Sequence, residues 1–286
     1  MYLLFADSSN NEHYQPLEEY RMTTVQIQDY FDKLGIREQI KPTVAGMTSL
    51  HRAQHRTLPF ENLDVYVGKA VKLDIEAIFE KLVRNHRGGY CFEVNGLLLH
   101  VMDCLGFTVR PLLARVHLSG EPSGRSHQVT LATIDDQQWI VDAGFGANTP
   151  RAPLKLTVHG EQQVDHQCFR FIEDARWGYL LQVKQQDWVS LYSLDMTYVC
   201  RGDMAYGNHF TSTSPDTHFT SSLIAARPIE GGLITLLDDM LKIRMGNEEV
   251  KEVALTKENV AENFKRHFDI QLDASQLRDI ISKLGW

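Results

Sequence analysis

The chain has 286 residues, 43% of them hydrophobic and 23% charged, so it is long enough for two or three globular domains with a substantial core. Its formal net charge is −8 and its charges form no blocks, which argues against nucleic acid or a membrane surface as a partner. No apolar run approaches the roughly 20 residues of a transmembrane helix, and residues 1–5 are too short, and lack the basic flank, for a signal peptide.

The first part of the chain predicts helices. Residues 1–21 are polar and aperiodic, so we expect a mobile extension, and Met22 is a candidate for the true start. Apolar residues at helical spacing then predict a helix over residues 25–34, capped by one of the two threonines before it and ended by Gly35.

A second helix is predicted over residues 43–53. His51 and His55 are four apart, as in a zinc-binding pair, but a metalloprotease also needs a glutamate directly after the first histidine, and here Arg52 follows. We therefore expect no metal at this pair. Pro59 breaks the helix.

A turn and a third helix lead to a glycine-rich stretch. Glu61 and Asn62 predict a turn that side-chain hydrogen bonds tie into the core. Residues 74–83 have apolar positions on one helical face and predict the third helix, which delivers the chain to Gly88 and Gly89.

The stretch Arg87-Gly88-Gly89-Tyr90-Cys91-Phe92-Glu93-Val94-Asn95-Gly96 carries the first sign of chemistry. Apolar residues repeat at helical spacing over residues 94–105, and Gly106 is a natural stop. Cys91 therefore sits at or next to a helix N-terminus, where unpaired N–H groups and the helix dipole favour a thiolate. A nucleophile and a buried structural cysteine are both compatible with this position.

The other cysteines do not change the class of protein. None of Cys91, Cys104, Cys168 and Cys200 belongs to a C-x-x-C pair, and their spacing is not that of a zinc site. Reduced thiols in an intracellular protein are the simpler interpretation, so we expect a cytoplasmic protein without a metal site.

After Gly106 the pattern changes to short strands with polar turns, which predicts an antiparallel β-barrel or strongly curved sheet. Because it contains Pro111, we expect the first of these strands to lie at a sheet edge or to contain a bulge. The strands are predicted at residues 107–118, 127–134, 138–143, 168–173, 178–184 and 188–191.

The last part of the chain predicts mixed structure. Residues 208–222 are rich in Thr and Ser and predict a loop, either a polar linker or a segment that offers small hydroxyls to a ligand. Two strands and two helices follow, the second helix with Asp273 as its N-cap, at residues 223–227, 233–237, 257–268 and 274–284.

A nucleophilic cysteine needs a base and a group that orients the base. His127 opens one predicted strand and Asp142 closes the next, so both lie at the same end of one hairpin. A turn centred between Asp136 and Gln137 puts Asp142 opposite Leu131, on the same face as His127 but ~13 Å from it. A bulge, a shifted register or a bent strand end must close this gap if the two side chains pair.

Several runs together resemble the arylamine N-acetyltransferases, in an order that matches from about Met22 to the C-terminus. The Arg-Gly-Gly-x-Cys-Phe-Glu-x-Asn run is the most specific, and a weaker one is Thr211-Ser212-Thr213-Ser214-Pro215. The others are His51-Arg52-Ala53-Gln54-His55, Pro59-Phe60-Glu61-Asn62, Ser126-His127 and Val141-Asp142-Ala143-Gly144-Phe145-Gly146.

The resemblance implies an α+β fold in three parts. These are an N-terminal helical bundle with the cysteine over residues 22–106, a central antiparallel β-barrel with the histidine and aspartate over residues 107–215, and a C-terminal α/β lid over residues 216–286. It also implies a cysteine-protease-like core, in which the Cys–His–Asp triad is Cys91, His127 and Asp142.

The implied reaction is ping-pong transfer of an acetyl group from acetyl-CoA, through an acetyl-cysteine, to arylamines, arylhydrazines or N-hydroxyarylamines. The enzyme would hold no permanent cofactor and would be a monomer or weak homodimer. The two glycines before Cys91 would keep the approach to its sulfur free of side chains. The implied contacts with CoA are Ser126, Phe145, Gly146 and Thr213.

Three other functions stay open at this point. A Cys–His–Asp hydrolase would turn over esters or amides with water and without CoA. An amide synthase of the same family would close macrolactams from a carrier-bound polyketide. A non-catalytic binding module would leave Cys91 no more reactive toward iodoacetamide than the other three cysteines.

Overall fold

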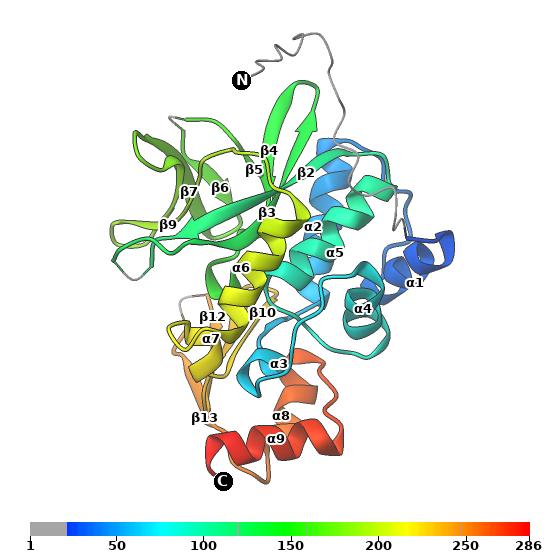
Figure 1. Ribbon diagram of the computed structural model, residues 1–286, viewed down its shortest axis with the longest axis vertical. Coiled ribbons are helices and arrows are strands. Elements are labelled where there is room, and N and C mark those ends of the chain that lie inside the picture. Colours follow the sequence, from blue (N-terminus) through cyan, green and yellow to red (C-terminus); the bar gives the residue numbers. More distant parts are fainter. Residues whose placement is uncertain (1–21, 119, 159, 247) are drawn as a thin grey trace, which may run out of the picture.

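A computed structural model describes residues 22–118, 120–158, 160–246 and 248–286, and the extension predicted for residues 1–21 lies outside them. Figure 1 shows the helices α1, α2, α4 and α5 beside a large curved sheet, with a second sheet and α8 and α9 at the lower end. The helical segments are α1 (Thr24–Leu34), α2 (Val44–Thr57), α3 (Leu63–Tyr66), α4 (Ile75–Phe79), η2 (Glu80–Arg84), α5 (Cys91–Cys104), η3 (Gly146–Asn148), α6 (Arg201–Thr213), α7 (His218–Ser221), α8 (Val260–Asn263), η4 (Phe264–Phe268) and α9 (Ala274–Leu284). Of these, η2 and η4 are π-helical and η3 is a 3-10 turn.

The predicted helices of the first third are present with their caps. The Thr23 side chain accepts from a backbone N–H of the first turn of α1, and Gly35 ends that helix in the left-handed conformation with φ +70°. Helix α2 runs on from the predicted end at residue 53 to Thr57. Asp74 caps α4, and its turns continue as η2.

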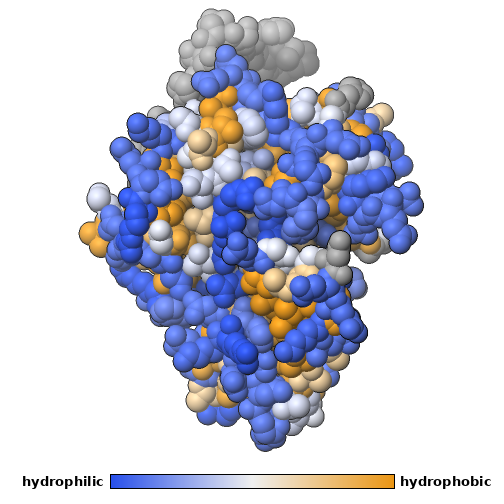
Figure 2. Space-filling model, turned by 180° about the vertical axis from the view of Figure 1, so that it is seen from behind, coloured by the Kyte–Doolittle hydropathy of each residue, from blue (hydrophilic) through white to orange (hydrophobic). Residues whose placement is uncertain are grey.

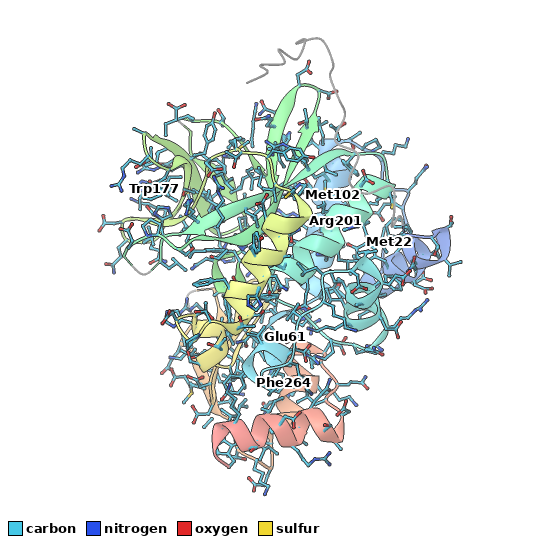
Figure 3. The ribbon with its side chains drawn as sticks, viewed as in Figure 1. Met22, Glu61, Met102, Trp177, Arg201 and Phe264 are labelled. Carbon is cyan, nitrogen blue, oxygen red and sulfur yellow. The ribbon has the colours of Figure 1, made fainter. Side chains whose placement is uncertain are left out.

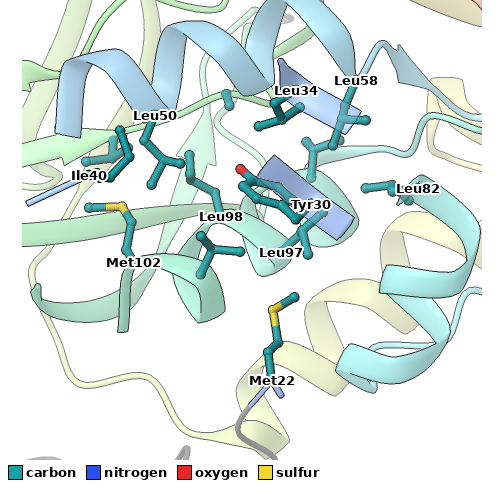
Figure 4. Packing of buried hydrophobic residues seen from close by; sticks show 14 of the residues in the cluster. Met22, Tyr30, Leu34, Ile40, Leu50, Leu58, Leu82, Leu97, Leu98 and Met102 are labelled. Carbon is teal, nitrogen blue, oxygen red and sulfur yellow. The ribbon is translucent and has the colours of Figure 1, made fainter. Parts of the chain in front are cut away.

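The helical core is built around Tyr30. Figure 4 shows its ring among the leucines of α2 and α5, where it is fully buried. Its hydroxyl donates to Gln54 Oε1 at 2.7 Å, and Gln54 Nε2 donates to Val94 O at 2.8 Å. This core also contains Ile134 and Val141 from the large sheet. The helices and the sheet therefore share one hydrophobic interior, and the domain boundaries expected at residues 106 and 215 stay predictions.

The large sheet confirms the predicted antiparallel, barrel-like β-structure. Its eight strands pair in the order β5-β4-β3-β2-β9-β8-β7-β6, and side chains from the two end strands, Leu154 of β5 and Val164 of β6, share one core. The strands are β2 (Thr108–Val116), β3 (Arg125–Ile134), β4 (Gln137–Val141), β5 (Leu154–Lys155), β6 (Gln162–Val164), β7 (Gln167–Asp174), β8 (Gly178–Lys184) and β9 (Trp188–Leu194).

The second sheet joins the C-terminus to an early part of the chain. Its order is β1-β10-β11-β12-β13, and all its pairs are antiparallel. The predicted turn at Glu61 and Asn62 is its edge: Asn62 accepts from Ile224 N and donates to Phe219 O and Ser222 O. The strands are β1 (Phe60–Glu61), β10 (Ile224–Ile229), β11 (Gly232–Leu237), β12 (Met240–Met245) and β13 (Lys251–Ala254).

The loop predicted over residues 208–222 is wrong, because this part of the chain forms the end of α6 and all of α7. Tertiary packing overrides the weak helix propensity of its Asn, Ser and Thr residues. A Cβ at Gly207 would lie 2.9 Å from the Phe92 ring, so α6 packs directly on α5. The hydroxyls of Ser212 and Thr213 donate to carbonyls one turn earlier and serve the helix.

The surface is mixed in polarity. Figure 2 shows hydrophobic patches separated by hydrophilic residues on the rear face. Within the described ranges, no helix combines the length and the apolar character that crossing a membrane requires.

Candidate active site

Cys91 is the first residue of α5. The chain enters this helix from an extended Tyr90, whose N–H donates to Glu93 Oε2 at 3.1 Å. Lys81 holds the other oxygen of Glu93 at 2.7 Å, so the helix start is tied to η2. The Cys91 side chain is 3% exposed and lies at the wall of a cleft of about 600 Å³. The predicted position at a helix N-terminus is confirmed.

A β-bulge aims His127 at Cys91. In the β2–β3 ladder Ala114 pairs with His127, but the next residue of β2 pairs with Arg125, so Ser126 is the extra residue. Such a bulge frees a carbonyl and turns the neighbouring side chain. Ser126 O accordingly accepts from the Cys91 Sγ at 3.9 Å and from the Thr211 hydroxyl at 3.4 Å.

The hairpin register expected from the sequence is wrong by two residues. Asp135 and Asp136 both have positive φ, at 49° and 59°, so they form the two-residue turn themselves and Ile134 pairs with Gln137. Continued past the end of β4, this register sets Asp142 opposite residue 129, two residues from His127 on the same face. Diagonal neighbours of this kind lie ~7 Å apart, within reach of side chains. The ~13 Å gap therefore does not exist.

Asp142 is held from several sides. Its Oδ2 accepts from His127 Nε2 at 2.8 Å. Its Oδ1 accepts from Asn95 Nδ2 and from Gly144 N, each at 2.9 Å. Its backbone carbonyl accepts from His51 Nε2 at 2.9 Å. With Nε2 engaged, the remaining ring nitrogen of His127, Nδ1, is the one that shares the side-chain hydrogen bond with Cys91.

These contacts favour a charged imidazole. Burial alone would lower the pKa of His127, but the Asp142 charge and hydrogen bond, together with Cys91, raise it to about 10. Burial likewise opposes the charge of Asp142, yet His127, Asn95 and the Gly144 N–H lower its pKa below the ordinary value. The site therefore stabilises an aspartate–imidazolium pair next to the cysteine.

The glycines before Cys91 have a different role from the one expected. Gly88 and Gly89 do not line the cleft. A Cβ at Gly88 would collide with Pro59 O, and one at Gly89 would lie 2.8 Å from the Glu93 Cβ. Glycine is required at both positions because neighbouring backbone and side-chain atoms leave no room for a Cβ. Neither residue keeps the approach to the Cys91 sulfur free.

Gly144 is the glycine that borders the cysteine. A Cβ there would lie 2.5 Å from Val94 Cγ2 and 3.1 Å from Cys91 Cα. It also lines the cleft and donates its N–H to Asp142. A side chain at this position would push apart the segments that hold the cysteine and the carboxylate.

The cleft contains most of the predicted contact residues. Ser126, Phe145 and Gly146 line it, and the Phe145 ring packs edge-on against His127 with 4.8 Å between centroids. Thr213 is exposed and is not among the lining residues; Thr211 lines the cleft instead. The other aromatic side chains of the wall are Phe60, Phe210 and Phe219. Over the described ranges, no cluster of three or more His, Cys, Asp or Glu side chains could hold a metal ion.

Comparisons with known proteins decide the family. A family model described as N-acetyltransferase matches residues 43–277. A Salmonella typhimurium protein named arylamine N-acetyltransferase / N-hydroxyarylamine O-acetyltransferase is 38% identical over 210 residues, which are 72% of this chain and 75% of that protein. The chain belongs to the arylamine N-acetyltransferase family.

Solved structures of arylamine N-acetyltransferases agree with this assignment. The structure from Salmonella typhimurium matches with a TM-score of 0.86 at 31% identity, over 92% of this chain and 99% of that one. The Mycobacterium marinum enzyme in complex with CoA matches with a TM-score of 0.83 at 29% identity, over 90% and 98% of the two chains. The α+β fold and the acyltransferase family expected from the sequence are therefore confirmed.

Two residues that position the side chains of this candidate site were not predicted from the sequence. Asn95 lies one turn after Cys91 on the same helix face, and besides Asp142 it bonds Gln128 O at 2.7 Å and Ala143 N at 2.8 Å. Its spacing from the cysteine was a usable signal. His51 carried no such signal, because its partner Asp142 is 91 residues away.

The remaining charged residues of the family motifs form a buried network below the site. Arg87 Nε donates to Glu61 Oε1 at 2.9 Å, and Arg87 also pairs with Asp64. Glu61 is fully buried in the lower half of the molecule (Figure 3) and accepts from Leu63 N at 2.7 Å. This network links the chain before α5 to β1, so it fixes where the cysteine helix starts.

Proposed function

We propose that this chain transfers an acetyl group from acetyl-CoA to the nitrogen of an arylamine, an arylhydrazine or an N-hydroxyarylamine by a ping-pong mechanism. The observation that carries the proposal is the continuous contact from Cys91 through His127 to Asp142 at the wall of the cleft. A nucleophile, a base and a group that orients the base are the parts that covalent acyl transfer requires.

In the first half-reaction the Cys91 thiolate attacks the thioester carbonyl of acetyl-CoA. Asp142 keeps the His127 imidazole oriented and stabilises its charge. The N–H groups of Glu93 and Val94 donate to Tyr90 O, so the N–H of Cys91 at the start of α5 is the one that can bind the oxyanion. The bond between the acetyl carbon and the CoA sulfur breaks, the CoA sulfur takes the proton from His127 Nδ1, and CoA leaves as the thiol while Cys91 carries the acetyl group. We propose that the donor contacts Ser126, Phe145 and Gly146; the contact with Thr213 stays a prediction.

In the second half-reaction the acceptor nitrogen attacks the acetyl-cysteine and His127 Nδ1 takes its proton. An aromatic amine suits this step because it is neutral at pH 7 and can act as a nucleophile at once. The aromatic side chains Phe60, Phe145, Phe210 and Phe219 give the cleft wall flat apolar surfaces that favour a ring over an aliphatic amine.

The proposal is tested by mixing the protein with acetyl-CoA alone. We expect a rapid release of about one CoA per active site, and an acetyl group on the peptide that contains Cys91 after acid quenching. Cys91→Ala abolishes both while folding is retained, whereas the matched variant Cys168→Ala keeps both. No burst of CoA, or activity retained in Cys91→Ala, contradicts the proposal.

The same experiment separates the alternatives. Decay of the acetyl-cysteine in water as fast as with an aniline would indicate a hydrolase. Acceptance of a carrier-bound polyketide instead of acetyl-CoA would indicate an amide synthase. The cytoplasmic location and the monomer or weak homodimer are further predictions, which fractionation of cells and sedimentation of the purified protein address.

A further inference from the structure

A second cavity, of about 330 Å³, lies behind the active site. Phe92 and Gln128 line it, whereas their chain neighbours Cys91 and His127 line the cleft. Adjacent residues of a strand point to opposite faces, so β3 separates the two spaces. Among the residues that the structure describes, none lines both.

The wall of this rear cavity is apolar and its mouth is open. The buried side chains, each 1–4% exposed, are Ile75, Ile78, Phe92 and Leu99. Arg201 and Ala205 are exposed at the mouth, and Figure 3 shows Arg201 at the start of α6, beside α5. Clefts of a few hundred Å³ with such walls are the usual form of small-molecule sites.

Gln128 is the one polar group that the fold leaves unexplained here. It is 1% exposed, and neither Nε2 nor Oε1 has a hydrogen-bond partner in the described part of the chain. A buried amide without partners is destabilising, so such groups usually serve a ligand or another function. Its head group faces Gly96, where an added Cβ would lie 3.9 Å from both amide atoms.

We propose that the rear cavity binds a neutral, flat, mostly apolar molecule that carries a primary carboxamide or a lactam. The Gln128 amide offers a donor and an acceptor side by side, and a carboxamide or lactam presents the complementary acceptor and donor. The charged side chains of its lining, Asp74 and Arg201, are exposed, so a charged group held deeper in the cavity beside Gln128 would have no buried counterion, which favours a neutral occupant. This site is separate from the proposed acetyl transfer and does not depend on it.

The probe is benzamide, titrated into isotope-labelled Cys91→Ala protein and followed by NMR. In this background any binding is independent of acyl chemistry. We expect saturable shifts of the Gln128 side-chain amide and of the Gly96 N–H. Gln128→Leu keeps the volume and removes both polar atoms, so the affinity for benzamide falls at least about tenfold while that for toluene is unchanged.

Two controls keep the test decisive. Gln138→Leu, an exposed position on the neighbouring strand, leaves benzamide binding unchanged. The second control needs no variant at Gln128. N,N-dimethylbenzamide has no N–H to donate, so it binds more weakly than benzamide to protein that keeps Gln128. The proposal is overturned by equal benzamide affinity in Gln128→Leu, by equal binding of the two amides, by shifts confined to the cleft around Cys91, or by no binding up to the solubility limit.

Discussion

The substitution Asp142→Asn tests how the site activates Cys91. The oxygen of the introduced amide can keep the bonds from Asn95 and Gly144, so the fold is preserved. The amide nitrogen then faces His127 Nε2 and forces it to accept. The proton moves to Nδ1, which points at Cys91 and can no longer take the thiol proton.

The magnitude follows from the pKa of His127. It lies at about 10, against about 6.5 for an ordinary histidine, and each pKa unit corresponds to about 1.4 kcal/mol. Asp142 is the main group that raises this pKa, and Cys91 adds to it, so loss of the Asp142 charge removes several kcal/mol, on the order of 5, of stabilisation from the imidazolium. We expect the rate constant for the first turnover to fall by a factor of about 10³ to 10⁴.

Two assays measure this effect. Stopped-flow release of CoA gives the rate constant for acetylation of Cys91, and alkylation by iodoacetamide gives its reactivity without any acetyl donor. Both fall together in Asp142→Asn. Cys91 is 3% exposed whereas Cys200 is exposed, so faster labelling of Cys91 in the unsubstituted protein cannot come from access alone.

The matched control is Asp136→Asn, the same substitution in the exposed turn of the same hairpin. Asn tolerates the positive φ of that turn, so stability and both rates stay at the original level. If Asp142→Asn retains more than a tenth of either rate with an unchanged thermal unfolding curve, the role assigned to the Asp142–His127 pair is refuted.

Further predictions concern packing, charge and pH. Gly144→Ala lowers the free energy of unfolding by about 1–3 kcal/mol and reduces acetyl transfer. The control Gly160→Ala, with open space at its Cβ and away from the cleft, changes neither, and equal denaturation midpoints of the two variants would contradict this. Arg87→Met leaves the Glu61 carboxylate buried and without its charge partner, which lowers the free energy of unfolding by about 3–5 kcal/mol. In urea unfolding, the double variant Arg87→Met with Glu61→Leu is therefore more stable than the single variant Arg87→Met. Burial lowers the pKa of His55 in the folded protein, whereas in the unfolded chain His55 has an ordinary pKa of ~6.5. The unfolded chain therefore binds the proton first, and the free energy of unfolding decreases as pH falls through ~6.5. His55→Phe flattens that part of the plot of stability against pH, and an unchanged slope would show that His55 titrates normally.

Local patterns predicted much of the fold. Helix periodicity and caps gave α1 and α9 with Thr23, Gly35 and Asp273 in the expected roles, because these signals act within one or two turns. Period-two runs gave the strands of the curved sheet in the same way. The segment over residues 208–222 was predicted wrongly because its helix depends on packing against Phe92, which no local pattern records.

The relation between His127 and Asp142 marks the limit of such reasoning. The sequence placed both at one end of a hairpin, but a choice between two adjacent turn centres changed their separation by about two residues of strand, ~7 Å. The preference of Asp135 and Asp136 for positive φ was a local signal that would have selected the observed register.

The sequence by itself determined the cysteine at a helix start, the order of helices and strands, and the resemblance to a family. Only the tertiary structure decided what holds these parts together: the bulge at Ser126, the hydrogen bond from His51 to Asp142 O, and the close packing of Gly144 against the backbone of Cys91. It also decided that Gln128, beside the histidine, faces a separate cavity. Contacts of this kind join residues far apart in the chain, and their energies depend on distances that neither composition nor spacing encodes.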